Sequence, residues 1–156
     1  MTAGDVLGFS NLFAAGMLAG TEFVIRYAVR GPLASLDDRA HIRMRQALIR
    51  PLRLLVPAMY FLTLLSAVAV TILDGAGPGL ALRCAAVLAL LAWIAVTLGG
   101  TVPINSAVLD WDPGAPPRDW RAQVDRWERL NSVRAWLAVG AFALLLAATA
   151  LHATAA

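Results

Sequence analysis

The chain has 156 residues, of which 60% are hydrophobic, and its formal net charge is +3. Soluble domains average about 45–50% apolar residues, so this composition does not fit an ordinary soluble domain. Cys84 is the only cysteine, which excludes an intrachain disulfide framework and a thiolate metal cluster within one chain.

Four stretches of the chain are long and almost free of charged residues. Crossing a bilayer takes about 20 mostly apolar residues, so we predict helices over residues 6–29, 52–73, 80–104 and 118–153, the last entering the membrane near residue 132. A soluble bundle would show a polar stripe every three to four residues, and "YFLTLLSAVAVTIL" shows none. The first stretch lacks the basic start of a secretory signal. The predicted fold is an all-α polytopic membrane protein, a four-transmembrane-helix bundle forming a single domain over residues 1–156.

The segment between the first two spans, "SLDDRAHIRMRQALIRP", predicts a short amphipathic cytoplasmic helix. Ser35 and Asp38 fit a capping box at its start, and Pro51 is expected to end it. We expect His41 to be solvated. A basic amphipathic helix of this kind lies on an anionic membrane surface. The expected apolar face consists of Leu36, Ala40, Met44 and Ala47 with Leu48, and the expected polar face of Arg39, Arg43, Gln46 and Arg50.

The segment "RDWRAQVDRWERLNSVRAW" predicts a cytoplasmic extension that enters the membrane as the fourth span. Residues spaced three and four apart share one face of a helix. The expected inward face consists of Trp120, Val124, Trp127, Asn131 and Arg134. The residues expected to point away and pair with one another in water are Arg121, Asp125, Glu128 and Arg129.

The arginines predict how the chain is oriented. All 13 basic residues are arginines. They gather between spans one and two and between spans three and four, whereas "DGAGPG" contains none. Basic loops stay in the cytoplasm. We therefore expect an integral protein of a bacterial-type inner (plasma) membrane, with both termini outside and both long loops cytoplasmic. The small net charge follows from this arrangement and does not indicate a nucleic-acid partner.

Polar residues from all four spans fall at one depth near the cytoplasmic side. An ionisable residue at membrane depth normally faces the bundle interior and indicates a functional site, and we name Arg134 as the partner of Glu22. Simpler interpretations stay open. Glu22 could pair locally with Arg26, Asn105 could only cap the end of span three, and the tryptophans could be interfacial belt residues. The residues placed at this depth are Glu22, Tyr60, Thr63, Asn105 and Arg134.

The order of three motifs carries a resemblance to a known family. "TEF" ends the first span, "VPIN" ends the third, and "WERLNSVR" begins the fourth. This set resembles the DUF1772 family of small four-helix membrane proteins, the anthrone oxygenase-like proteins, over nearly the whole chain. Many members carry histidine where this chain has Asn131. This departure weakens a metal-ligand or proton-shuttle role at Asn131, which could still donate a hydrogen bond.

The resemblance implies a membrane-embedded oxygenase, because characterised relatives in aromatic polyketide biosynthesis convert an anthrone to an anthraquinone with O2 and without flavin or haem. We therefore expect a monooxygenase that needs no cofactor besides the co-substrate O2. Glu22 is expected to be the base, and Arg134 and Asn105 the donors that hold an oxyanion. The residues expected to bind the hydrophobic aromatic substrate are Trp127, Trp120, Tyr60, Asn131 and Thr63.

Two other functions stay open. A non-catalytic membrane protein that binds a lipid or small molecule, or an accessory subunit, predicts an interior closed by side chains with no cavity beside Asn105. A metal-dependent oxygenase would need ligands, but the expected topology puts His41 and His152 on opposite sides of the membrane, so no metal site is expected. Membrane lipid is an expected partner. The spacing of Gly16 and Gly20 fits a helix packing contact and is compatible with a homo-oligomer.

Overall fold

The computed structural model describes residues 3–155, which form four long helical rods and no strand. Each rod contains a helix long and apolar enough to cross a membrane, which confirms the predicted four-helix membrane bundle. Two rods change from α-helical to π-helical geometry along their length. The elements are α1 (Ala3–Val24), η1 (Ile25–Val29) and α2 (Arg30–Ala34) in the first rod, α3 (Asp38–Asp74) in the second, α4 (Leu80–Val96), η2 (Thr97–Thr101) and α5 (Val102–Asp110) in the third, and α6 (Trp120–Ala155) in the fourth.

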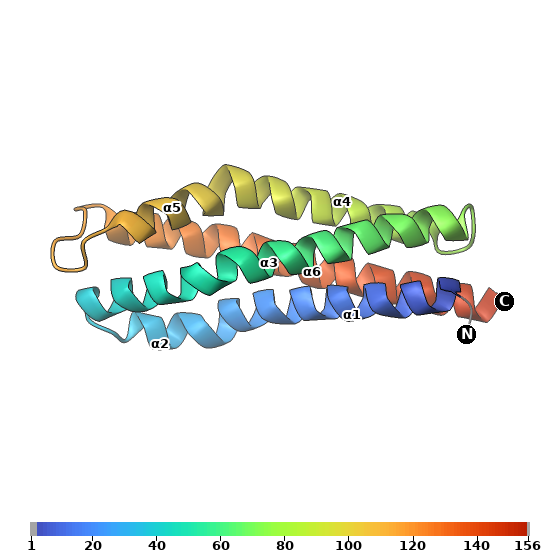
Figure 1. Ribbon diagram of the computed structural model, residues 1–156, viewed down its shortest axis with the longest axis horizontal. Helices are drawn as coiled ribbons and strands as arrows, with labels where there is room; N and C mark the ends of the chain where they lie inside the picture. Colours follow the sequence, from blue (N-terminus) through green and yellow to red (C-terminus); the bar gives the residue numbers. More distant parts are fainter. Residues whose placement is uncertain (1–2, 156) are drawn as a thin grey trace.

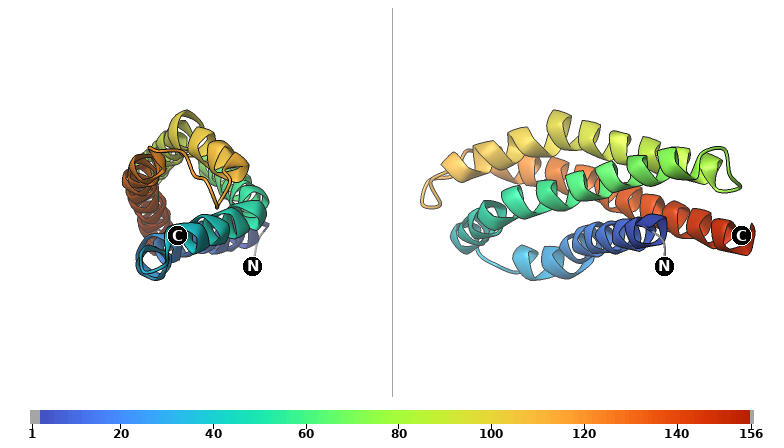
Figure 2. Two further views of the ribbon diagram at one scale, coloured as in Figure 1. Left: turned by 90° about the vertical axis from the view of Figure 1, so that its left-hand side faces the viewer. Right: turned by 45° about the vertical axis from the view of Figure 1, so that its right-hand side comes forward.

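The rods run up and down in turn, so both termini lie at one end of the molecule (Figure 1). Viewed along the rods they form a ring in which α3 and α6 lie on opposite sides (Figure 2, left). α6 packs against α1 and α4, and α3 packs mainly against α1. The contact between α3 and the third rod is less extensive. The third rod bows outward, with its apex near η2 (Figure 1).

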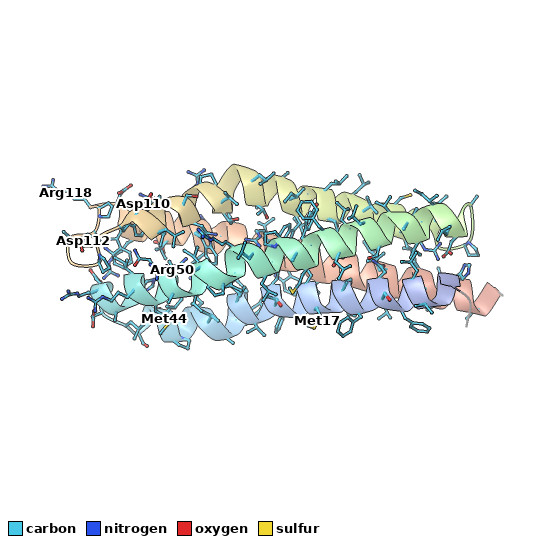
Figure 3. The ribbon with its side chains drawn as sticks, viewed as in Figure 1. Met17, Met44, Arg50, Asp110, Asp112 and Arg118 are labelled. Carbon is cyan, nitrogen blue, oxygen red and sulfur yellow. The ribbon has the colours of Figure 1, made fainter. Side chains whose placement is uncertain are left out.

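Two apolar clusters hold the ring together on either side of its middle. The first cluster, in the half of the bundle that contains both chain ends, is rich in alanine, which lets helices approach closely. The second cluster lies toward the α5–α6 connection, at the end of the molecule where Asp110, Asp112 and Arg118 lie (Figure 3). The first cluster includes Ala15, Leu18, Tyr60, Ala67, Ala86, Leu90, Trp93, Ala138 and Leu145, and the second consists of Ile42, Ile49, Ile104, Val108, Trp111, Trp120 and Val124.

The segment predicted to be a separate surface helix is the first part of α3. Pro51 and Pro57 both lie inside this continuous 37-residue helix, so the prediction that Pro51 ends a helix is wrong. A proline removes one hydrogen bond, but packing on neighbouring rods can hold a helix through it. Asp37 rather than Ser35 caps α3, because its side chain accepts a hydrogen bond from the Ala40 N–H at 2.9 Å.

The buried face of this part of α3 is also not the predicted one. His41, predicted to be solvated, is only 8% exposed and lies edge-on to Trp120, with 5.4 Å between ring centroids. Gln46, predicted on the polar face, is 9% exposed. Its Nε2 donates to the carbonyl oxygens of Val108 and Trp111, both at 2.9 Å. Packing and hydrogen-bond partners on other helices therefore decide which face of α3 is buried. Leu36 and Met44, which were predicted on the buried apolar face, stay exposed.

The third rod is longer than predicted, because α5 continues to Asp110 instead of ending at residue 104. Asn105 therefore lies inside a helix, and the interpretation that it only caps a helix end is wrong. Gly100 lies against α6. A Cβ atom at this position would come 2.6 Å from Leu130 Cδ1. Of the two glycines predicted to form a packing contact, Gly16 lies near α6, where an added Cβ atom would come 3.4 Å from Phe142 Cε2, whereas an added Cβ atom at Gly20 would have nothing within 4 Å.

Candidate functional site

A cavity of about 460 Å³ lies between the two apolar clusters, within the range of about 300–1,000 Å³ that small-molecule sites occupy. All four rods contribute to its wall, including both π-helical segments. Single π-helical turns occur frequently at functional sites. Apolar lining residues include Ile25, Val29, Leu52, Val56, Phe61, Ile94, Leu98 and Leu109, and the polar or aromatic ones include Arg30, Arg45, Arg53, Trp93, Thr97, Thr101, Asn105, Ser106, Trp127, Glu128, Asn131 and Arg134.

The deep end of the site contains the predicted ion pair. Arg134 Nη2 donates to Glu22 Oε1 at 2.5 Å, and Arg134 Nη1 donates to Thr101 Oγ1 at 3.1 Å. Glu22 is 0% exposed and Arg134 is 6% exposed. The guanidinium carbon of Arg134 lies 4.4 Å from the centre of the Trp93 ring. The pairing of Glu22 with Arg134 is confirmed, and three rods hold the guanidinium in place.

A second ion pair lies on the same wall, nearer the α2–α3 connection. Arg45 Nη2 donates to Glu128 Oε1 at 2.9 Å, and Arg30 Nε lies 3.7 Å from Glu128 Oε2. The Arg45 guanidinium carbon lies 4.7 Å from the centre of the Trp127 ring. The prediction that Glu128 points into water is wrong, because Glu128 is only 8% exposed. A usable signal was its spacing of three residues from Asn131 on α6, which keeps it near the inward face.

Several polar atoms on the cavity wall have no hydrogen-bond partner in the part of the chain that the structure describes. A buried polar group without a partner costs about 1–3 kcal/mol, so such atoms are expected to meet water or a ligand. These atoms are Arg45 Nε, Trp93 Nε1, Asn105 Oδ1, Trp127 Nε1, Glu128 Oε2, Asn131 Nδ2 and Arg134 Nε.

Four of the predicted site residues therefore line the cavity together: Asn105, Trp127, Asn131 and Arg134. Glu22 does not line it and contacts it through Arg134. The non-catalytic interpretation predicted an interior closed by side chains with no cavity beside Asn105. The structure instead has a cavity there. A hollow at this place favours a ligand site.

The other three predicted residues lie outside the cavity wall. Tyr60 stacks on Trp93, with 4.7 Å between ring centroids, and its hydroxyl donates to the Leu90 carbonyl at 3.2 Å. Thr63 donates to the Met59 carbonyl at 2.8 Å. Trp120 packs in the second apolar cluster. The hydroxyl groups of Tyr60 and Thr63 are hydrogen-bonded within the bundle and Trp120 packs in an apolar cluster, so all three support the cavity without lining it.

Metal ligands are sparse in the structure. Within residues 3–155 no group of three or more His, Cys, Asp or Glu side chains is placed to hold a metal ion. His41 lies beside Trp120, whereas His152 Nδ1 lies 3.9 Å from Asp74 near the opposite end. The polar chemistry that the cavity offers is therefore that of guanidinium, carboxylate, amide, indole and hydroxyl groups.

The fold and the site define a small integral membrane protein of four helices with a mostly apolar, arginine-bearing cavity in its interior. Residues 45–144 match the sequence model of a family described as anthrone oxygenase. The chain belongs to this family, and its function at the family level is anthrone-oxygenase-like. The matched region includes Arg45, Asn105, Glu128 and Arg134. A comparison with curated proteins and one with solved structures found no match.

Proposed function

We propose that the protein is an oxygenase that converts a hydrophobic polycyclic aromatic substrate of the anthrone type to the corresponding anthraquinone, with O2 as co-substrate and no further cofactor. The observation that carries this proposal is the cavity of about 460 Å³, whose apolar wall is interrupted by Arg134, which pairs with Glu22 behind it, and by Asn105 and Asn131. Membership of the anthrone oxygenase family supports the same reaction class.

The reaction asks little of the protein beyond a base and an oxyanion site. The anthrone methylene loses one proton and becomes a carbanion whose charge is shared with the ring carbonyl. The carbanion transfers electrons to O2, a carbon–oxygen bond forms, and protonation gives a hydroperoxide. Loss of water from the hydroperoxide leaves the second carbonyl of the quinone. One O2 is consumed, and one water is released for each substrate molecule.

Arg134 is the proposed donor to the substrate oxygen, with Asn105 and Asn131 beside it. Preorganised donors aimed at developing charge are often the largest catalytic contribution. Glu22 and Thr101 hold the Arg134 guanidinium in position before substrate arrives. Asn131 is 1% exposed and its Nδ2 has no hydrogen-bond partner among the described residues. Trp127 supplies an aromatic wall on which flat rings can stack.

Glu22 is the proposed base, acting through its Oε2 while its Oε1 stays paired with Arg134. Its Oε2 is buried and free of hydrogen bonds in the described part of the chain. Hydrogen bonds of catalytic groups are often incomplete before substrate binds, so the position of Glu22 behind Arg134 is compatible with this role. Glu128 is the matched control for Glu22, because it is a second carboxylate and lines the cavity directly.

Oxygen uptake by membranes that contain the protein tests the proposal. A dithranol-type anthrone is supplied, and the spontaneous rate in membranes without the protein is subtracted. Loss of a general base lowers the rate by about 10²–10⁴-fold. The rate of Glu22→Gln should therefore fall by an amount in that range, and the rate of Glu128→Gln should fall less. Arg134→Ala should also be slow. Equal rates in the wild type and all variants would refute the enzymatic proposal.

Metal analysis separates this proposal from a metal-dependent oxygenase. Purified protein is assayed for iron and copper, and oxygen uptake is measured again after dialysis against a chelator. We expect less than one metal ion per chain and an unchanged rate. One equivalent of iron or copper that is lost together with activity would favour the metal-dependent reaction instead.

A further inference from the structure

We infer that the protein selects aromatic substrates that carry an acidic group, and that Arg45 and Arg30 bind this group at the outer end of the cavity while Arg53 adds positive charge to the same cavity wall. The inference rests on the proposed function for the statement that this ligand is a substrate. It concerns the second ion pair, which that function leaves unused.

The two ends of the cavity are built from the same three residue types. At the deep end, Arg134 pairs with Glu22 and lies over Trp93, and at the outer end, Arg45 pairs with Glu128 and lies over Trp127. Arg134 and Glu128 are six residues apart on α6, which corresponds to about 9 Å along the helix. A flat molecule of three fused rings spans roughly this distance, so one substrate can reach both ends.

The two ends differ in charge. One arginine faces one glutamate at the deep end, but Arg45 and Arg30 both face the single carboxylate of Glu128 at the outer end, and Arg53 also lines the cavity. Arg30 lies 3.7 Å from this carboxylate with its side chain 52% exposed, and Arg53 forms no ion pair in the part of the chain that the structure describes. Two positive charges are therefore left without compensation beside an apolar cavity, and such a field favours an organic anion.

The hydrogen-bonding groups at the outer end fit a carboxylate. Arg45 Nε and Trp127 Nε1 are buried donors that have no partner among the described residues. Arginine presents several N–H groups in one plane and binds a carboxylate through two parallel hydrogen bonds. The aliphatic walls behind this end suit the uncharged rings of the same ligand. An aromatic acid therefore matches both the polar end and the apolar body of the cavity.

Equilibrium binding of two product analogues tests the inference without turnover. Purified protein in nanodiscs of phosphatidylcholine is titrated at pH 7 with anthraquinone-2-carboxylate and with anthraquinone-2-carboxamide, which have nearly the same shape and differ in charge. We expect the carboxylate to bind about tenfold more tightly, as charge-assisted hydrogen bonds require. Equal affinities would overturn the inference.

The variants replace exposed arginines, because substitutions at exposed positions are expected to leave the fold intact. Arg30→Gln combined with Arg53→Gln should reduce the preference for the carboxylate to about threefold or less. Arg50→Gln is the matched control, because Arg50 lies one turn from Arg53 on α3, is exposed, and does not line the cavity. A preference that falls equally in the control and the double variant would contradict the inference.

Anionic lipid is the other source of a negatively charged group. The titration is repeated in nanodiscs that contain phosphatidylglycerol. If this lipid abolishes the preference through the same arginines, the outer end is a headgroup site and the inference is wrong. A preference that persists in both kinds of disc supports it. Oxygen uptake without a preference would leave the proposed function intact and remove only this inference, whereas a preference without oxygen uptake would remove the proposed function and leave a binding site for an aromatic acid.

Discussion

At the scale of single residues, the Glu22–Arg134 pair dominates the buried interior. Both side chains are almost completely buried, and both retain one polar atom without a hydrogen bond in the described residues. Removing one partner of a buried pair leaves an uncompensated charge, whereas replacing both by neutral groups does not. Removing one member of the pair is therefore expected to lower the free energy of unfolding strongly, whereas replacing both members is expected to change it little.

Comparison of a single with a double variant measures this difference. Arg134→Met should lower the free energy of unfolding by about 3–5 kcal/mol, because it leaves the Glu22 carboxylate alone in an apolar interior. Glu22→Gln combined with Arg134→Met should recover most of that loss. Unfolding in mixed detergent micelles gives both values. Equal destabilisation by the single and the double variant would show that the pair is not buried as described.

The site residues were only partly predictable from sequence, and the reason differs between the two pairs. Glu22 and Arg134 sit in uncharged stretches at the same expected depth, so the need for a partner identified them. Arg45 and Glu128 sit among other charged residues, where hydropathy makes no distinction between a buried charge and a solvated one. Only the tertiary fold shows that α3 turns Arg45 toward α6.

At the scale of elements, the geometry of the third rod shapes the cavity. η2 joins α4 to α5 and contributes Thr97 and Thr101 to the site. Gly100 lets η2 approach Leu130 of α6 more closely than any other residue type would. The sequence predicted the rod but not this change of helix type, because residues 97–101 belong to the same uncharged stretch as α4 and carry no local signal that sets them apart.

Adjacent glycines of η2 test the importance of this contact. A methyl group at Gly100 would meet Leu130 at 2.6 Å, whereas Gly99 has nothing within 4 Å of the same position. Gly100→Ala should therefore lower the unfolding temperature in detergent and weaken binding of an anthraquinone. Gly99→Ala should be neutral or stabilise by about 0.4–1 kcal/mol, because alanine reduces the freedom of the unfolded chain. The same effect from both substitutions would contradict this packing.

At the scale of the whole molecule, hydropathy was enough to predict four rods in one bundle, because each rod needs a long apolar surface. The predicted ends of the rods were wrong where a helix continues beyond its uncharged stretch, as α3 and α5 do. Charge adds an orientation that the fold itself does not contain. The arginine-rich connections at one end predict that this end, and with it the outer end of the cavity, faces the cytoplasm.

Cysteine labelling tests this orientation. Ala76→Cys and Ala115→Cys are introduced separately into a Cys84→Ala background, and intact cells are treated with a membrane-impermeant maleimide. Both positions are exposed and lie in connections at opposite ends of the bundle. We expect Ala76→Cys to react in intact cells and Ala115→Cys to react only after the cells are opened. The reverse pattern would place both termini in the cytoplasm.

The central claim is that the aromatic substrate is oxidised inside the cavity, and a tryptophan placed in that space tests it most directly. Ile94 lines the cavity, whereas Leu88 on the same helix is 65% exposed and lies outside it. Oxygen uptake with an anthrone is measured for Ile94→Trp and Leu88→Trp after both are shown to unfold at similar temperatures. We expect Ile94→Trp to lose at least about tenfold in rate, because the indole takes the place of the substrate rings, and Leu88→Trp to keep the wild-type rate. An Ile94→Trp protein as active as the wild type would contradict it.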